Sequence, residues 1–304
     1  LESLEIQRGS LSRIGGVPEG FEALVLANLT RGSAARTGVI HIARDAEGME
    51  ATRQLLTFFA PEIEVRMFPA WDCMPYDRVS PSPTVLSQRM ETLGALAERP
   101  DGGEAMVMLT TINAALQRIP PRVSVSAGSL TVKPGDAVGM AALNSLLAWD
   151  GYVRTGTVRE PGEYAVRGGI MDVFPPGQEE PLRLDLFGDH LESLRTFDPL
   201  TQRTTGDAAR LLLVPASEIQ LDPDSVARFR ANYQARFGTV GAEDPLYTSV
   251  TAGRRHAGAE HWLPLFHDSL ETVFTLLPNA TVILAHGVED VRAARLDLIT
   301  DNYR

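Results

Sequence analysis

The stretch GVIHIARDAEGMEATRQLLTFF, residues 38–59, joins a short apolar run to a segment with helical spacing. The run at 38–43 predicts a buried strand, and the rest predicts a helix from about residue 45 to 59, opened by Asp45 in the N-cap position. The pattern continues with strands expected at 64–68 and 105–111 and helices at 85–99 and 111–119. This alternation favours an α/β fold with a parallel sheet.

Two further segments are notable, one before these units and one between the strand at 64–68 and the helix at 85–99. Residues 15–20, GGVPEG, predict a turn that feeds a helix, and that helix is expected to present one side made of Phe21, Leu24, Val25, Asn28 and Leu29. Residues 69–84, PAWDCMPYDRVSPSPT, contain four prolines and paired aromatics. Prolines lack the backbone donor that regular structure needs, so this segment is predicted to be a loop.

The pattern changes near residue 120. From about 129 to 215, a helix at 139–151 is followed by short alternating strands, predicted at 152–158, 164–169, 170–174, 182–187 and 191–197. From 216 onward, a helix at 224–238, a strand at 281–287 and a closing helix resume the first pattern. We therefore predict three parts: 1–128 and 216–304 form one lobe, and 129–215 form a small α+β domain inserted into it.

Composition restricts the class of protein. Acidic residues outnumber basic residues by 39 to 28 in 304, and the net charge of -11 argues against nonspecific duplex binding by the chain as a whole. A protein partner is the better expectation. No apolar run approaches the roughly 18 residues of a membrane helix, and the single cysteine, Cys73, fits a reducing compartment, so we expect a cytoplasmic protein without membrane contact. The final residues, DLITDNYR, end on a helical pattern, which predicts that the natural chain is longer.

A nucleotide site is the first chemistry to consider, because the glycine turn at 15–20 precedes a helix whose N-terminus favours anions. A P-loop also needs Gly-Lys-Ser/Thr, and the chain has one lysine, Lys133. The helix opens instead with Glu19 and Glu22, whose carboxylates would repel a triphosphate. The dipeptide Asp-Glu, which could hold the metal, is absent from the sequence. We predict that this chain neither hydrolyses ATP nor binds a cofactor.

Metal and nucleophile chemistries are equally incomplete. The segment 254–268 contains His256, Glu260, His261 and His267, but their spacing matches no zinc pattern, so they are interpreted as surface and packing residues. The loop residues Asp72, Cys73, Tyr76 and Asp77 have no histidine nearby in sequence that could act as a base. The sequence therefore predicts no catalytic and no metal-ligating residues.

The strand at 182–187 leaves two interpretations open. Leu182, Leu184 and Leu186 share one face, and Arg183, Asp185 and Phe187 share the other. In the first interpretation, Phe187 packs beside the Gly188 turn and Arg183 pairs with Asp185 or a cross-strand acid. In the second, an exposed ring flanked by guanidinium groups forms a protein-docking patch.

Four longer strings carry a family resemblance. They are FPAWDCMPYDRVSPSPTVLSQRMETL (68–93), REPGEYAVRGGIMDVFPPG (159–177), LRLDLFGDHLESLRTFDPLTQRT (182–204) and GAEHWLPLF (258–266). From about residue 15 to the end, the chain resembles the amino-terminal part of the bacterial transcription-repair coupling factor family, Mfd. That part is similar to the excision-repair protein UvrB, so the resemblance implies a degenerate helicase-like, RecA-like lobe split by an inserted domain. It also implies that ATP and Mg²⁺ act only in a motor elsewhere in the full protein.

The resemblance further implies a partner and a site. The family's inserted domain binds UvrA, and the arginine of its Y-A-x-R-G string falls on Arg167. The arginine and the aromatic of its R-L-D-x-F string fall on Arg183 and Phe187. The paired acid that follows in the family is here Gly188-Asp189, which removes one charge from that turn.

The family implies that RNA polymerase and DNA are bound by other regions and that the UvrA-binding surface is masked within the full chain. Two alternatives stay open: a divergent nucleotide-binding α/β protein and a DNA-binding module.

Overall fold

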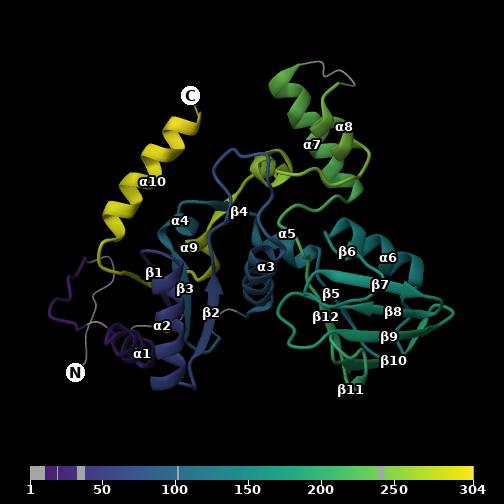
Figure 1. Ribbon diagram of the computed structural model, residues 1–304, viewed down its shortest axis with the longest axis horizontal. Helices are drawn as coiled ribbons and strands as arrows, with labels where there is room; N and C mark the ends of the chain where they lie inside the picture. The colour runs from purple at the N-terminus through teal and green to yellow at the C-terminus, as the bar shows by residue number, and fades with distance from the viewer. Residues whose placement is uncertain (1–10, 19, 33–37, 101–102, 239–242, 304) are drawn as a thin grey trace. The chain divides into compact units, whose positions relative to one another are not determined.

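The computed structural model describes residues 11–18, 20–32, 38–100, 103–238 and 243–303 (Figure 1). The chain forms two compact units. Unit 1 consists of residues 1–70, 98–118 and 272–304, and unit 2 consists of residues 71–97 and 119–271. The short strands β4 (Arg118–Ile119) and β13 (Glu271–Thr272) lie where the chain passes from one unit to the other. The three-part division of the sequence at residues 129 and 215 stays a prediction.

Unit 1 is built on a four-stranded parallel sheet with the strand order β14-β1-β3-β2. Its strands are β1 (Val39–Ala43), β2 (Glu64–Phe68), β3 (Met106–Thr111) and β14 (Thr281–Leu284). β1 and β3 are buried at every position, as expected of central strands in a sheet covered on both faces. The predicted α/β fold with a parallel sheet is confirmed.

Helices α1 (Glu22–Arg31) and α2 (Ala46–Phe59) cover one face of this sheet through a shared apolar core. The predicted start of α2 is confirmed, because Asp45 Oδ1 accepts a hydrogen bond of 2.8 Å from the Gly48 N–H. Of the five residues predicted to share one side of α1, Val25 and Leu29 are buried and Leu24 is partly buried, whereas Phe21 and Asn28 are exposed. The buried side of α1 also contains Ala23, Leu26 and Ala27.

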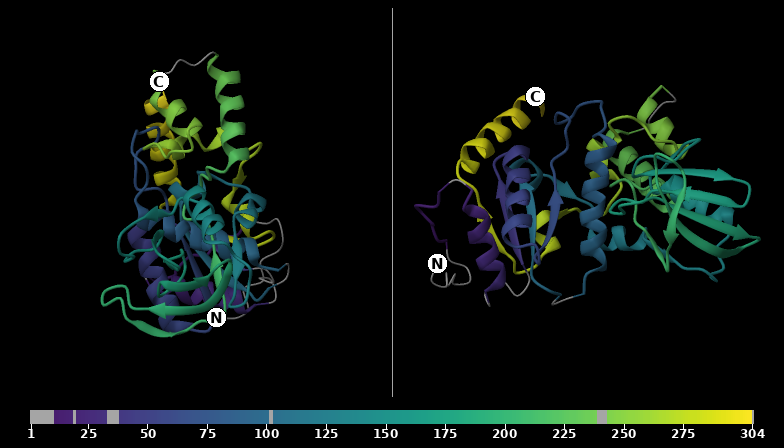
Figure 2. Two further views of the ribbon diagram at one scale, coloured as in Figure 1. Left: turned by 90° about the vertical axis from the view of Figure 1, so that its right-hand side faces the viewer. Right: turned by 60° about the horizontal axis from the view of Figure 1, so that its bottom comes forward.

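The remaining helices of unit 1 are α4 (Ile112–Ala115), α9 (Val273–Leu276) and α10 (Val288–Tyr303). The helix predicted at 111–119 is shortened to α4, and the chain enters strand β4 at Arg118. Of the residues in α10, all of which the structure describes, Val288 alone is buried, and Figure 2 shows this helix extending away from the sheet. Across the described part of the chain, no helix combines the length and the apolar character that crossing a bilayer requires.

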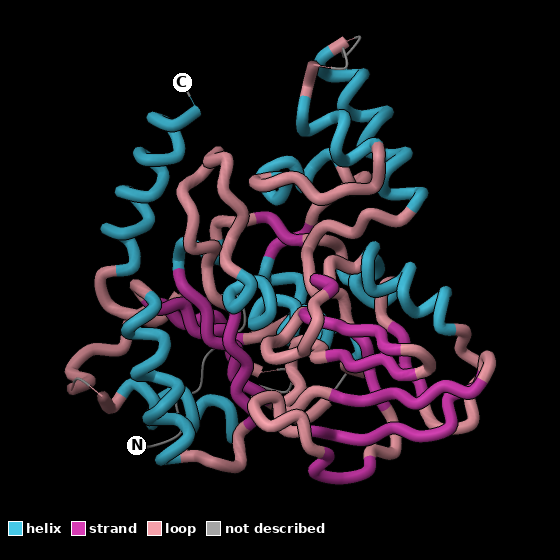
Figure 3. Tube along the Cα trace, turned by 45° about the vertical axis from the view of Figure 1, so that its right-hand side comes forward, coloured by secondary structure: helices cyan, strands magenta, loops and turns pink. Residues whose placement is uncertain are grey.

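Unit 2 contains a six-stranded sheet, whose strands are drawn in magenta in Figure 3. The strand order is β11-β10-β9-β8-β7-β6. Its strands are β6 (Val153–Arg154), β7 (Glu163–Arg167), β8 (Ile170–Val173), β9 (Leu182–Phe187), β10 (His190–Phe197) and β11 (Thr204–Asp207). Neighbours from β7 to β11 are antiparallel, and β6 runs parallel to β7. The strand predicted at 152–158 is reduced to β6, because the chain bends away from the sheet around Gly156.

One face of this sheet, the inner face, packs on helix α6 (Met140–Trp149) and on the pair β5 (Leu130–Val132) and β12 (Leu211–Leu213). The predicted alternation of strand β9 is confirmed, because Leu182, Leu184 and Leu186 all enter this core. The opposite face of the sheet, the outer face, therefore carries the polar positions of the strands.

The other helices of unit 2 are α3 (Pro83–Glu98), α5 (Arg122–Ala127), α7 (Pro223–Phe237), α8 (Pro245–Thr251) and the 3-10 helix η2 (Ala259–Leu265). A buried ion pair joins α3 to the segment that follows β12. Arg89 Nε and Nη2 lie 2.6 and 3.2 Å from the two carboxylate oxygens of Glu218, and both side chains are fully buried. Trp71 Nε1 donates a further 2.9 Å hydrogen bond to Glu218 Oε1.

Candidate functional site

The outer face of the six-stranded sheet brings the three sequence-predicted residues onto one surface. The register places Arg167 opposite Ile170, and Ile170 opposite Asp185. It also places Asp172 opposite Arg183. Residues opposite each other in a sheet project from the same face, and every second residue of a strand does so as well. Arg167, Arg183 and the terminal Phe187 therefore share the outer face.

Phe187 is the most exposed apolar residue of this face. Its side chain is 76% exposed at the end of β9, opposite His190, where the chain turns through Gly188 with φ of 62°. That positive φ suits glycine and lets β9 and β10 connect tightly, so the ring stands at the tip of the hairpin. An interpretation in which the ring packs beside the turn does not describe this geometry.

Arg183 is held within the sheet. Its Nε and Nη2 donate to Asp172 Oδ1 and Oδ2 at 2.7 and 2.9 Å, and its guanidinium lies 4.7 Å from the centre of the Phe197 ring. The hydrogen bonds to Asp172 raise the pKa of Arg183 further above its usual value. The Arg183 side chain is 18% exposed and Asp172 is 2% exposed, so the cross-strand pairing foreseen in the first sequence interpretation is present.

Arg167 is more open than Arg183. Its side chain is 52% exposed, with Nη2 donating to the Gly156 carbonyl at 2.7 Å and Nη1 4.0 Å from Asp172 Oδ2. Two guanidinium groups thus share one carboxylate. Asp185 is paired in turn with Arg195.

Two residues of this face were missed by the sequence reasoning. Asp172 joins both arginines, and Ile170, which is 36% exposed, lies directly between the strand positions of Arg167 and Asp185. The sequence could have indicated both residues, because alternation in the string IMDVF puts Ile170 and Asp172 on one face of the strand and Met171 on the other. A small buried apolar cluster adjoins these polar residues, since Ala165 lies opposite Asp172 and the Phe197 ring lies beside Arg183. Its members are Val158, Ala165, Phe174 and Phe197.

The start of α1 differs from an open anion site. Glu22 Oε1 lies 3.0 Å from Nε2 of His41, a buried residue of β1, and this hydrogen bond holds the pKa of Glu22 below its usual value. An ionised carboxylate therefore lies at the helix N-terminus, where a phosphate would otherwise be attracted. Glu19, the other acidic residue singled out in the sequence, lies outside the described residues.

The histidine and cysteine residues considered for catalysis lie in packed surroundings. His261 is half-buried, with its ring 5.5 Å from that of Trp71 and its Nε2 3.8 Å from Cys73 Sγ. Burial lowers the pKa of His261 and raises the pKa of the Cys73 thiol, so both neutral forms are favoured. Among the residues that the structure describes, no three His, Cys, Asp or Glu side chains gather as metal ligands would.

Comparison with known proteins assigns the region of the six-stranded sheet to a family. The UvrB interaction domain matches residues 130–219, a span that includes Arg167, Arg183 and Phe187. The transcription-repair-coupling factor of Haemophilus influenzae is 32% identical over 89% of this chain and 23% of its own length. The proteins of the same name from Escherichia coli and Myxococcus xanthus are 30% and 32% identical over 98% and 92% of this chain. The chain spans about a quarter of the length of these relatives.

Proposed function

The chain is an amino-terminal, UvrB-like module of the transcription-repair-coupling factor family, and we propose that it recruits UvrA during transcription-coupled nucleotide excision repair. In this proposal the inserted sheet is the docking domain and its outer face is the docking surface. Arg167, Arg183 and Phe187 are the residues through which UvrA is bound. The helicase-like lobe carries this domain without turning over nucleotide.

The exposed ring of Phe187 is the observation that supports this proposal best. An isolated phenylalanine exposed to 76% at the tip of a hairpin contributes nothing to the core of its own sheet. Aromatic anchors with arginines nearby are enriched among residues that dominate protein interfaces. The surface fits a partner that offers an apolar pocket for the ring and carboxylates for the arginines.

The two arginines have different parts in the proposed interface. Arg167 is exposed and has donors that can reach a partner carboxylate, so it is the direct electrostatic contact. Arg183 is mostly buried and is bound to Asp172, so it fixes the position of that carboxylate. Only the exposed edge of its guanidinium can contact the partner. Losing Arg167 should therefore affect binding alone, whereas losing Arg183 should affect binding and the stability of the sheet.

Titration of UvrA with single variants tests the proposal. Phe187→Ala should weaken binding by roughly 30-fold, because an interface anchor of this kind contributes ~2 kcal/mol or more. Arg167→Ala should weaken it by about tenfold or more, the value of a charge-assisted hydrogen bond. Isothermal titration calorimetry or surface plasmon resonance with purified UvrA gives both values.

A matched control exists in unit 1. Phe58 is 78% exposed, so Phe58→Ala removes an equally accessible ring from a different surface and should leave UvrA binding unchanged. Wild-type affinity in both Phe187→Ala and Arg167→Ala would show that the docking surface is elsewhere. An equal loss in Phe58→Ala would show that exposed rings act nonspecifically.

The absence of nucleotide turnover and of a cofactor is part of the same proposal. It is supported by the missing P-loop lysine and by the Glu22 carboxylate at the start of α1. A thermal-shift measurement with Mg-ATP tests it, since a ligand at 100 times its Kd would add ~2.7 kcal/mol of stability. An upward shift that Glu22→Gln enlarges would contradict the proposal and favour a divergent nucleotide-binding protein.

The proposal extends to the full-length coupling factor, of which this chain is one module. We propose that other regions carry the ATP-dependent motor and bind RNA polymerase and DNA, in the cytoplasm, and that an intramolecular contact masks the outer face. The isolated chain should then bind UvrA more tightly than the full-length protein does. Equal affinities would contradict masking, and a steep loss of DNA binding with salt in the isolated chain would favour a DNA-binding module.

A further inference from the structure

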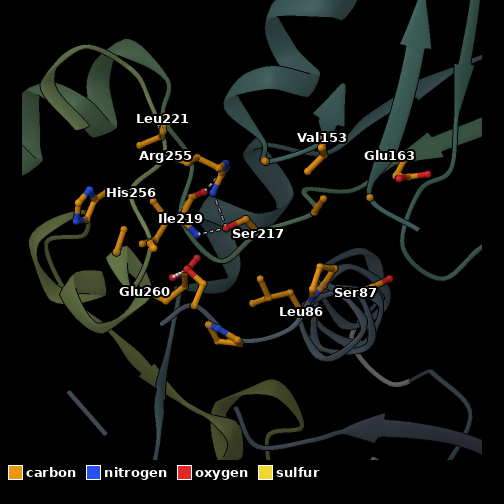
Figure 4. A pocket seen from close by; sticks show the side chains of 18 of the residues that line it. Leu86, Ser87, Val153, Glu163, Ser217, Ile219, Leu221, Arg255, His256 and Glu260 are labelled. Atoms are coloured by element: carbon orange, nitrogen blue, oxygen red, sulfur yellow. Dashed lines mark hydrogen bonds between the residues drawn. The ribbon is translucent and has the colours of Figure 1, made fainter. Parts of the chain in front are cut away.

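A pocket of about 370 Å³ lies in unit 2, outside the proposed docking residues (Figure 4). Segments 80–87, 151–163, 216–221 and 250–260 all contribute to its lining, and Arg167, Arg183 and Phe187 do not. Its volume falls in the range of small-molecule sites, which are mostly apolar with a few fixed polar groups. Proline and aliphatic side chains, among them Leu86, Val153 and Leu221, supply the apolar part.

Arg255 is the positive group of this pocket. Its Nη1 donates to Ser217 Oγ at 2.9 Å, and its Nη2 donates to the carbonyl oxygens of Ile219 and Trp149 at 2.9 and 3.2 Å. All three acceptors are neutral. Within the described ranges, no carboxylate lies within 4.0 Å of this guanidinium, so its position is fixed while its charge has no contacting counterion.

Gly151 makes the placement of this guanidinium possible. Its φ is +93°, and a Cβ at this position would lie 2.5 Å from Arg255 Nη2 and 2.6 Å from Ser217 Cβ. Both distances are far below van der Waals contact, so only glycine leaves the space that the guanidinium occupies. Arg255 is therefore held in a site that the surrounding backbone is shaped to receive.

Glu260 is the negative group of the pocket. The residue is 6% exposed, and its Oε2 accepts a 2.6 Å hydrogen bond from Ser80 Oγ, which itself accepts from the Gly258 N–H at 2.9 Å. Figure 4 shows the Glu260 carboxylate and the Arg255 guanidinium both directed toward the Ser217–Ile219 segment. As far as the chain is described, no lysine, arginine or histidine nitrogen lies within 4.0 Å of this carboxylate, so Glu260 and Arg255 form no ion pair and attract each other only from a greater distance.

We propose that this pocket binds a small zwitterionic ligand of the amino-acid class. The ligand's carboxylate is bound by Arg255, its ammonium group is bound by Glu260, and its aliphatic part contacts the apolar lining. Glu260 is buried and Arg255 is exposed at the pocket, and each is held in place by hydrogen bonds. Opposite charges in separate, prearranged positions favour a ligand that carries both complements over one that carries either alone. The proposal concerns residues different from those proposed to bind UvrA, so neither proposal depends on the outcome of the other.

Three probes of equal chain length test the charge requirement: 6-aminohexanoate carries both charges, hexanoate the carboxylate alone and hexylamine the ammonium alone. Calorimetric titration of the purified chain should give 6-aminohexanoate a Kd at least about tenfold lower than that of either analogue, the value of one charge-assisted contact. Equal affinities for the three probes, or no binding of 6-aminohexanoate at roughly 10 mM, would overturn the proposal.

Variants assign the charges to residues. Arg255→Gln should remove the advantage of 6-aminohexanoate over hexylamine, and Glu260→Gln should remove its advantage over hexanoate. Arg254→Gln is the matched control, because Arg254 is exposed and does not line the pocket. Glu260→Gln retains an oxygen that can accept the hydrogen bond from Ser80 Oγ, so this variant should fold. It therefore tests the charge requirement even if Arg255→Gln does not fold. An unchanged Kd for 6-aminohexanoate in Glu260→Gln would overturn the proposal.

Discussion

Replacing Arg183 with alanine should destabilise the six-stranded sheet as well as weaken the proposed binding of UvrA. The variant takes two hydrogen bonds from Asp172, which is 2% exposed, and leaves Arg167 Nη1 at 4.0 Å as the nearest cation among the described residues. Breaking a buried ion pair costs about 3 to 5 kcal/mol. The partial exposure of Arg183 and the nearness of Arg167 place the expected cost at the lower limit, about 3 kcal/mol, including the lost contact with Phe197.

Urea unfolding of four proteins measures this cost and its origin. The wild type, Arg183→Ala, Asp172→Ala and the double variant form a double-mutant cycle, in which the coupling energy should be about 2 kcal/mol. Arg167→Ala is the control, since its side chain is 52% exposed and its removal should cost less than about 1 kcal/mol.

A loss below about 1 kcal/mol in Arg183→Ala, or a coupling energy near zero, would refute the reasoning. Arg183 would then have no structural part in the sheet, and its effect on UvrA binding would have to come entirely from direct contact.

Two other perturbations probe buried charges. Glu218→Ala should lower the free energy of unfolding by about 3 to 5 kcal/mol, because the buried Arg89 guanidinium loses its carboxylate. The double variant Arg89→Met with Glu218→Leu should recover most of that loss in urea unfolding. Additive losses from the two positions would contradict this. Burial raises the pKa of Asp150 from 3.8 to about 7, so the folded state favours the protonated carboxyl group. The stability that Asp150 contributes is therefore fully present below about pH 4 and is lost as the pH rises through 7. Asp150→Asn should flatten this decline, and parallel pH profiles of unfolding would contradict the assignment.

Much of the local structure could be predicted because its signals are local. Asp45 caps α2 through a bond to Gly48, three residues away, and the alternation at 182–187 separates buried leucines from Arg183 and Phe187. These patterns depend on the period of a helix or strand, which a single sequence displays. The same alternation, together with the family resemblance, was sufficient to select the face of the candidate site.

The pairings between distant segments could not be predicted. Asp172 rather than Asp185 binds Arg183 because of the register between β8 and β9, which the sequence of either strand alone does not specify. Glu218 meets Arg89 from 129 positions away. Which residues of α1 are buried depends on what covers the helix: Val25 and Leu29 of the predicted side are buried, but so are Ala23 and Ala27, and Phe21 is exposed.

The position of β14 has a consequence for the order of events on the ribosome. β1 receives one neighbour from residues 106–111 and the other from residues 281–284. The hairpins from β7 to β11 are close in sequence and can assemble as soon as they emerge, because contacts between nearby residues form first. The parallel sheet must instead wait, with one apolar edge open, until nearly all of this chain has been synthesised. Translation arrested before residue 281 should therefore yield a nascent chain whose middle is folded and whose beginning is prone to aggregate.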